Sequence, residues 1–308
     1  DLHPEDVVNS IDWRYLEDAL TKDEAIKILR EKEDNHEDIE LSMVQKGPKA
    51  YSTAGWLGLS DKEISETIKD MQAQGFDCFK MKVGQNLDYD KERLAFIRSI
   101  IGSESKLMLD CNQVWGVDEA ISYMTELKEF NPVWIEEPTA RDDVQGHIKI
   151  SNALKKFNIK VASGEQVPSP VIFKQLLQSK AIGYCQIDAS RLGGVNDVMA
   201  VILLAKKFNI PVCPHGGGIG LCNMIVHYAI WDQVKVASHS NTQVVEYLEF
   251  LQDEVFVHPI QVQDGHYVTP KSYGWGLEMK NEFFDSHVYP TGDIWKDRVE
   301  SGSITFLP

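Results

Sequence analysis

Three segments of the chain each carry a carboxylate directly after an apolar, strand-like run. They read LMLDCN, WIEEP and VASGEQ and supply Asp110, Glu136 and Glu165. If the runs are neighbouring parallel strands, their carboxyl ends meet at one edge and the three groups converge. Converging carboxylates need raised pKa values or a hard cation, and ligation by oxygen alone favours Mg²⁺ over zinc. We therefore predict a Mg²⁺ site, although each residue alone could be a helix N-cap and strand alternation cannot choose between Glu136 and Glu137.

Two lysines occupy alternate positions in the segment FKMKVG, at Lys80 and Lys82. Strand alternation places both on one face and the apolar Phe79, Met81 and Val83 on the other, so we expect the lysines to point into the protein. Crowded together there, they should lose their protons more readily than free lysine, which would make one of them a usable base. A solvated surface pair is the simpler alternative.

Two further segments, QIDASRLGG and PHGGGIG, place Asp188 and His215 at the ends of consecutive runs. A carboxylate beside a histidine fixes its tautomer and raises its basicity, as general acid or base catalysis requires. Alone, His215 could equally be a structural histidine. Asn112 shares the face of Asp110 and could contact a substrate or a water on the metal. Glu246 follows the last predicted strand and could be a further acid or hydrogen-bond partner, or lie on a solvated helix.

The elements that must position these residues form a repeat. Apolar or β-branched runs recur about every 26 residues, with helical spacing between them and a capping box at Ser60 and Glu63 that begins one helix. Eight strands alternating with seven helices predict an α/β fold, a TIM-like (β/α)7β barrel, with an open doubly wound sheet as the alternative. The predicted strands lie near Thr53, Met81, Leu109, Ile135, Ala162, Ile187, Val212 and Val236.

Composition excludes several other classes of protein. Lys and Arg number 31 against 47 Asp and Glu, a net charge of −16 that would repel nucleic acid. The longest apolar run, near residues 198–205, is far shorter than the roughly 20 residues that span a membrane, so no membrane partner is expected. The five cysteines form no CxxC pair and are expected to be reduced core residues. Neither a G-x-S-x-G nor a Walker motif is present, which argues against a serine hydrolase or a P-loop NTPase.

Taken in order, the motifs KMK, LMLDCN, WIEEP, SGEQ, QIDASRLGG and PHGGGIGLC resemble those of the mandelate racemase group of the enolase superfamily. Within that group the chain is most similar to the L-fuconate dehydratases, through phrases such as WIEEPT, VIFKQLLQ, AKKFNIPVCPH and YPTGDIWK. The resemblance implies Mg²⁺ bound by Asp110, Glu136 and Glu165, with Glu136 preferred over Glu137. It also implies dehydration of an acid sugar, most simply L-fuconate, to a 2-keto-3-deoxy sugar acid through an enediolate.

The same resemblance implies a role for each remaining residue. Lys82 would remove the C2 proton, and Lys80 would tune Lys82 and contact the substrate carboxylate. His215, oriented by Asp188, would protonate the departing C3 hydroxyl and then help to ketonise the enol, while Glu246 would line the substrate site. Two alternatives stay open: a racemase or epimerase of an α-hydroxy acid using the same site, and a catalytically silent truncated barrel that acts as a binding or regulatory module.

The resemblance also suggests how the chain is divided. Residues 1–48 are expected to be the last, helical remnant of an N-terminal α+β capping domain, residues 49–263 the catalytic barrel, and residues 264–308 an extension that packs towards the capping region. Since such a domain excludes water and reads the distal end of the sugar acid, its loss would affect specificity and turnover. A mitochondrial location is expected from the animal members, with the cytoplasm as the alternative because no leader is visible, and a homo-oligomer is compatible with these features.

Overall fold

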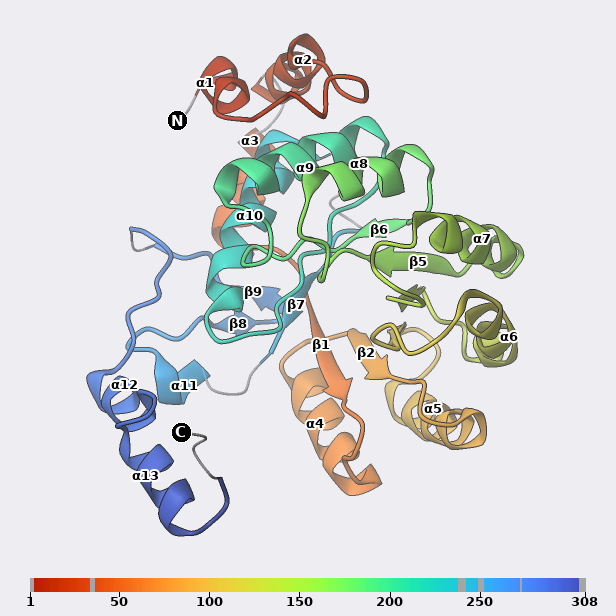
Figure 1. Ribbon diagram of the computed structural model, residues 1–308, viewed down its shortest axis with the longest axis vertical. Coiled ribbons are helices and arrows are strands. Elements are labelled where there is room, and N and C mark those ends of the chain that lie inside the picture. The colour runs from red at the N-terminus through yellow and green to blue at the C-terminus, as the bar shows by residue number, and fades with distance from the viewer. Residues whose placement is uncertain (1–2, 34–36, 238–241, 249–251, 272, 305–308) are drawn as a thin grey trace.

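A computed structural model describes residues 3–33, 37–237, 242–248, 252–271 and 273–304. Its main sheet is parallel throughout, with the strand order β6-β5-β4-β3-β2-β1-β7, and the helices surround it (Figure 1). The strands are β1 (Ala50–Gly55), β2 (Cys78–Lys82), β3 (Lys106–Asp110), β4 (Trp134–Glu136), β5 (Lys160–Ser163), β6 (Tyr184–Cys185) and β7 (Val245–Tyr247). The helices that connect them are α4 (Asp61–Ala73), α5 (Leu87–Ile101), α6 (Val117–Leu127), α7 (Val144–Leu154), α8 (Pro170–Gln178), α9 (Val195–Lys207) and α10 (Leu221–Lys235).

An extended segment, residues 211–215, fills the gap in the ring between β6 and β7. The Cys213 N–H donates to the Cys185 carbonyl at 2.8 Å, and the His215 N–H donates to the Ile187 carbonyl at 2.9 Å. On the other side, the Glu246 N–H donates to the carbonyl of Pro214 at 3.3 Å. Backbone hydrogen bonds therefore run around the whole ring, which confirms the predicted TIM-like (β/α)7β barrel.

The eighth strand predicted near Val236 is wrong. Helix α10 continues to Lys235, and the Val236 N–H donates to the carbonyl of Asp232 at 2.8 Å as the helix ends. The run QVKV alternates like a strand, but its apolar residues Val234 and Val236 are buried at the end of a helix instead. The last strand is β7, so Glu246 lies on that strand and not beyond it.

The predicted helix signals are confirmed where the barrel helices begin. Ser60 accepts a hydrogen bond from the Glu63 N–H, and Glu63 caps the Ser60 N–H in return, so the capping box begins α4. The apolar faces of α4, α5 and α6 are buried, because each helix packs against the outside of the barrel. All five cysteines, each within the described residues, are buried and free, as expected.

Short elements flank the barrel at both ends of the chain. Helices α1 (Pro4–Asn9), α2 (Lys22–Glu33) and α3 (Glu37–Gln45) precede it, and α2 contacts both α9 and α10. After it come α11 (Gln252–Val255), the hairpin of β8 (Val262–Gln263) and β9 (His266–Tyr267), α12 (Asn281–His287) and α13 (Asp293–Glu300). The Tyr267 N–H donates to the Pro48 carbonyl at 2.9 Å, which joins the segments before and after the barrel. Helix α13 lies at the far end of the molecule from α1 (Figure 1). Among the described helices, none is long and apolar enough to cross a bilayer.

Candidate active site

The three predicted metal ligands come together at the carboxyl ends of adjacent strands. Asp110 ends β3 and pairs with Glu136, which ends β4, and Glu165 lies two residues beyond β5. One oxygen from each carboxylate lies within 4.8 Å of the other two, and all three residues are buried. The structure therefore brings together the cluster predicted from the sequence.

The backbone separates Glu136 from its neighbour Glu137. Glu136 points into the barrel, where its carboxylate accepts a hydrogen bond from Gln186 Nε2 at 2.7 Å. Glu137 leaves the strand with φ +44°, and its carboxylate accepts one from Gln113 Nε2 at 2.8 Å. Burial, followed by the negative charge of Glu165, raises the pKa of Glu137 to about 8. Glu136 is thus the member of the cluster, and Glu137 is a fourth carboxyl group close to it.

The cluster carries more negative charge than its surroundings balance. Burial and the charge of Asp110 raise the pKa of Glu136 well above its usual range, although Lys80 acts in the opposite direction. Burial also acts to raise the pKa of Asp110, but Lys80 and Lys82 outweigh it and the pKa is lowered. A buried, oxygen-only donor set with an unbalanced charge fits a hard divalent cation such as Mg²⁺.

Both lysines of β2 point into the barrel, as predicted. Lys80 is 1% exposed, and its Nζ lies 2.8 Å from Glu136 Oε1 and 2.9 Å from Glu246 Oε1. Burial acts to lower the pKa of Lys80, but the charges of Glu136 and Glu246 outweigh it and hold the pKa well above its usual range. The prediction that crowding would ease proton loss is therefore wrong for Lys80, because carboxylates distant in sequence surround it.

Lys82 lies nearer the mouth of the barrel and has a different set of partners. Its Nζ donates to Asp110 Oδ2 at 2.5 Å and to Asn112 Oδ1 at 2.8 Å. Asn112 follows β3 with φ +46° and is exposed, so its amide lies at the rim of the site. The Trp56 ring packs against the ammonium group, with Nζ 5.1 Å from the ring centroid. Lys82 therefore lies beside one end of the carboxylate cluster.

His215 lies beside the other end of the cluster. Its Nδ1 is 2.9 Å from Asp188 Oδ2, and its Nε2 is 3.2 Å from Glu165 Oε2. Burial acts to lower the pKa of His215, but the hydrogen bond to Asp188 and the charges of Glu246 and Glu165 raise it to about 9. Burial acts to raise the pKa of Asp188, but hydrogen bonds from His215 and Ser190 lower it to about 2. At neutral pH the pair is an imidazolium held by a carboxylate.

Glu246 connects the lysine side of the site to the histidine side. Its carboxylate accepts hydrogen bonds from the Thr53 hydroxyl at 2.6 Å and from the Gly216 N–H at 2.8 Å. The same group pairs with Lys80 and lies 3.8 Å from His215 Nε2. Burial acts to raise the pKa of Glu246, but Lys80 and His215 outweigh it and the pKa is lowered. Glu246 is therefore an ionised bridge inside the barrel rather than part of a solvated helix.

Sequence reasoning missed several supporting residues. Gln186, which hydrogen-bonds Glu136, lies two positions before Asp188, so strand alternation could have placed it inward. Arg191 contacts Asp188 from three residues further along, and Thr53 lies on β1. The three-residue spacing of Arg191 from Asp188 could have identified that contact. No local pattern marks Thr53, because its partner Glu246 comes from β7 when the barrel forms.

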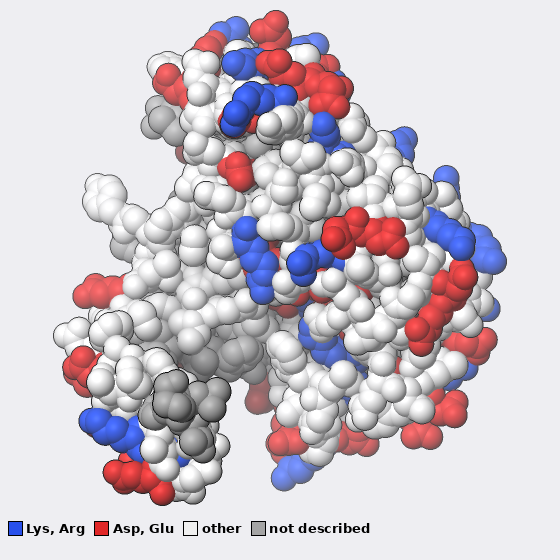
Figure 2. Space-filling view, in the orientation of Figure 1, with Lys and Arg blue, Asp and Glu red and all other residues white. Residues whose placement is uncertain are grey.

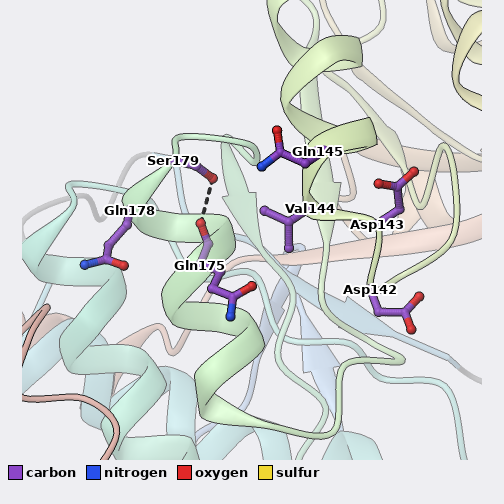
Figure 3. Close-up of a pocket in the computed structure, with 7 residues that line it drawn as sticks. All are labelled: Asp142, Asp143, Val144, Gln145, Gln175, Gln178 and Ser179. Carbon is purple, nitrogen blue, oxygen red and sulfur yellow. Dashed lines mark hydrogen bonds between the residues drawn. The ribbon is translucent and has the colours of Figure 1, made fainter.

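A depression lies on the outer surface, and its lining shares no residue with this site. Figure 3 shows it between the start of α7 and the end of α8, where Ser179 donates to the carbonyl of Gln175 at 2.6 Å. Asp143 in its wall accepts the Gly146 N–H at 2.8 Å and caps α7. Acidic and basic side chains are interspersed over the visible face in Figure 2. None of the residues that line this depression belongs to the carboxylate cluster.

Comparison with known proteins identifies related sequences and structures. Residues 63–283 match the family described as "Enolase C-terminal domain-like". "Mitochondrial enolase superfamily member 1" of Homo sapiens is 44% identical over 297 residues, which are 96% of this chain and 67% of that protein. "L-galactonate dehydratase" of Hypocrea jecorina is 44% identical over 294 residues, 94% of this chain and 65% of that protein. The chain spans about two thirds of the length of these relatives.

Solved structures agree with the sequence matches. The crystal structure of the human mitochondrial enolase superfamily member 1 superposes with a TM-score of 0.94, covering 96% of this chain and 67% of that one at 44% identity. A mutant L-talarate/galactarate dehydratase liganded with Mg and L-glucarate superposes with a TM-score of 0.67, covering 84% of this chain and 62% of that one at 25% identity. The (β/α)7β architecture is thus shared with both.

Proposed function

The chain belongs to the enolase superfamily, and from this premise we propose that it is a Mg²⁺-dependent sugar acid dehydratase that converts L-fuconate to its 2-keto-3-deoxy acid. One observation carries the proposal: a buried carboxylate cluster with Lys82 at one end and the Asp188-supported His215 at the other. Relatives named L-galactonate, talarate/galactarate and arabinonate dehydratases support the hydro-lyase class.

Asp110, Glu136 and Glu165 would hold the cation. Mg²⁺ bound there would stabilise the negative charge that develops on the substrate carboxylate as the C2 proton leaves. Lys80 is buried against Glu136 and stays protonated, so it would remain a fixed positive charge near the substrate carboxylate. The substrate would therefore sit with its carboxylate over the cluster and its C2 and C3 atoms between the two flanking groups.

Lys82 would act in its neutral form and remove the C2 proton, leaving an enediolate. His215 is held as an imidazolium, so it would donate a proton to the C3 hydroxyl as the C3–O bond breaks and water departs. The electron pair of the enediolate then forms the C2–C3 double bond of an enol. The enol then becomes the 2-keto-3-deoxy acid when the C2 hydroxyl loses its proton and C3 gains one. His215 at that end of the cluster would assist this ketonisation.

The remaining residues would position these two groups. Asp188 fixes the His215 ring through Nδ1, which leaves Nε2 towards the cluster. Asn112 and Glu246 would line the substrate site, Asn112 from the rim beside Lys82 and Glu246 from within the barrel.

The test is a panel of six-carbon and five-carbon sugar acids, including L-fuconate and L-galactonate, incubated with the purified chain and Mg²⁺. The 2-keto-3-deoxy product is followed by its semicarbazone absorbance. We expect turnover with L-fuconate that disappears in Lys82→Ala and His215→Asn. Product from none of the panel by a folded protein would contradict the proposal.

A second candidate is racemisation or epimerisation at C2, and the two ends of the cluster favour it. A proton acceptor at one end and a proton donor at the other allow the proton to leave one face and another to be delivered to the opposite face. The two candidates differ when the reaction runs in D₂O. Deuterium at C2 of recovered substrate, without loss of water, would identify the epimerase, whereas deuterium in a 2-keto-3-deoxy product identifies the dehydratase.

Residues 49–263 would form the catalytic unit, with residues 1–48 and 264–308 assigned to the capping region. A mitochondrial location is suggested by the name of the human relative. Fractionation of cells that express the natural gene, with a mitochondrial matrix marker as reference, tests the location.

A further inference from the structure

The end of β1 departs from regular pairing with its neighbour. The register between β1 and β2 shifts between Ser52 and Gly55. Gly55 then approaches β2 so closely that an added Cβ would lie 1.9 Å from Met81 Sδ and 3.1 Å from Met81 Cα. A bulge takes backbone groups out of the ladder, and buried carbonyls there need other donors.

Arg93 of α5 supplies those donors. The side chain is buried, and its Nη2 donates to the carbonyl of Gly55 at 3.3 Å and to that of Trp56 at 3.2 Å. Its Nη1 donates to the carbonyl of Lys82 at 2.9 Å. A guanidinium is a planar fork of fixed geometry, so one rigid group joins the ends of β1 and β2.

A second residue of α5 holds the chain just beyond Lys82. Asp90 is fully buried, and its Oδ2 accepts the Gly84 N–H at 2.7 Å and the hydroxyl of Tyr123 at 3.1 Å. Its Oδ1 lies 3.9 Å from Arg93 Nη1. The backbone from Lys82 to Gly84 is therefore fixed from one helix by an arginine at one end and by a carboxylate at the other.

The contacts of Arg93 also affect two side chains at the mouth of the barrel, those of Trp56 and Lys82. The Trp56 ring packs against the Lys82 ammonium group, and the backbone carbonyls of both residues are bound by the same guanidinium. We propose that Arg93 is a positioning residue for Lys82, which fixes the base and the Trp56 ring relative to the carboxylate cluster. This inference rests on the proposed function for its catalytic meaning, but its geometric content can be measured without turnover.

The experiment compares Arg93→Lys with Arg98→Lys in the full chain. Lysine keeps the charge but loses the fork that spans two strands. Arg98 lies on the same helix and also donates to backbone carbonyls, at 2.7 Å to Phe130 and 2.8 Å to Ser105, but these precede β4 and β3 at the other end of the barrel. Both substitutions should lower the melting temperature. A difference in kcat between the two variants would therefore not be explained by loss of stability alone.

Two readouts separate positioning from stability. The first is kcat and KM on the substrate found by the panel, where we expect kcat to fall roughly 10- to 100-fold in Arg93→Lys with little change in KM, and neither to change in Arg98→Lys. The second is ¹⁹F NMR of protein labelled with 5-fluorotryptophan, in which Trp56→Phe assigns one of the seven tryptophan signals. The Trp56 signal should move in Arg93→Lys and stay in place in Arg98→Lys.

An unmoved Trp56 signal, or an equal fall of kcat in both variants, would overturn the inference. If the wild-type chain turns over none of the panel, the proposed function fails. The Trp56 signal still decides whether Arg93 fixes the ends of β1 and β2. Should Arg93→Lys not fold, Arg93→Gln is read in the same way against Arg98→Gln.

Discussion

Replacing Asp188 with asparagine should change the pH dependence of catalysis through His215. The hydrogen bond from His215 Nδ1 to Asp188 is the largest of the contributions that raise the pKa of His215 to about 9. A hydrogen bond to a charged group contributes about 1.5–3 kcal/mol, and one pKa unit corresponds to about 1.4 kcal/mol, so Asp188→Asn should lower that pKa to roughly 7–8. The acid form that protonates the leaving hydroxyl would then be lost at lower pH.

The size of the effect follows from the two pKa values. With a pKa near 9, about nine tenths of His215 is protonated at pH 8, whereas with a pKa near 7 the fraction is about one tenth. At pH 6 His215 is almost fully protonated in both proteins, so any loss of kcat there reflects only the orientation of the ring. The ratio of wild-type to variant kcat should therefore grow by up to about tenfold between pH 6 and pH 8.

The assay is kcat measured with saturating substrate and Mg²⁺ from pH 6 to pH 10. Asp197→Asn is the matched control, because Asp197 lies in the first turn of α9 and accepts the N–H of Gly193 from the loop that carries Asp188. The carboxylates paired with His215 are those of Asp188, Glu165 and Glu246. The profile of Asp197→Asn should match that of the wild type. A ratio that stays constant from pH 6 to pH 8 would refute the assignment of His215 as the acid held by Asp188.

Three predictions concern stability, each measured by urea unfolding. In EDTA at pH 7, Glu136→Gln should raise the free energy of unfolding, because a carboxyl whose pKa is raised by folding costs stability once the pH exceeds its ordinary pKa. Equal or lower stability of the variant would contradict this. Gly55→Ala should cost about 1–3 kcal/mol, since its Cβ would collide with Met81, and a neutral result would show that β1 shifts freely. Ser60→Ala should cost about 1 kcal/mol by removing half of the capping box with Glu63, whereas no loss would mean that α4 is held by packing alone.

Local patterns predicted most of the helices and the inward-facing side chains. The capping box at Ser60 and the alternation around Lys80 and Lys82 depend only on neighbours in sequence, so both can be predicted from the sequence alone. The predicted strand near Val236 failed for a related reason. Four residues of alternating polarity fit either a strand or the end of a helix, and only the position of α10 against the barrel decides between them.

Electrostatic properties of the site depend on contacts between distant segments. Lys80 was expected to lose its proton readily, but Glu136 and Glu246, brought in from β4 and β7, reverse the direction of its pKa shift. The choice between Glu136 and Glu137 depended on the backbone turning to φ +44° directly after β4. Strand alternation alone leaves that choice open.

Mg²⁺ binding measured by calorimetry is the most direct test of the carboxylate cluster on which the proposed chemistry depends. Wild-type protein should bind one Mg²⁺ with a Kd in the range of roughly micromolar to millimolar. Glu137→Gln should retain that binding, and Glu136→Gln should lose it, because only Glu136 belongs to the buried triad. The absence of binding by a folded wild-type chain, or unchanged binding in Glu136→Gln, would contradict a metal-dependent dehydratase.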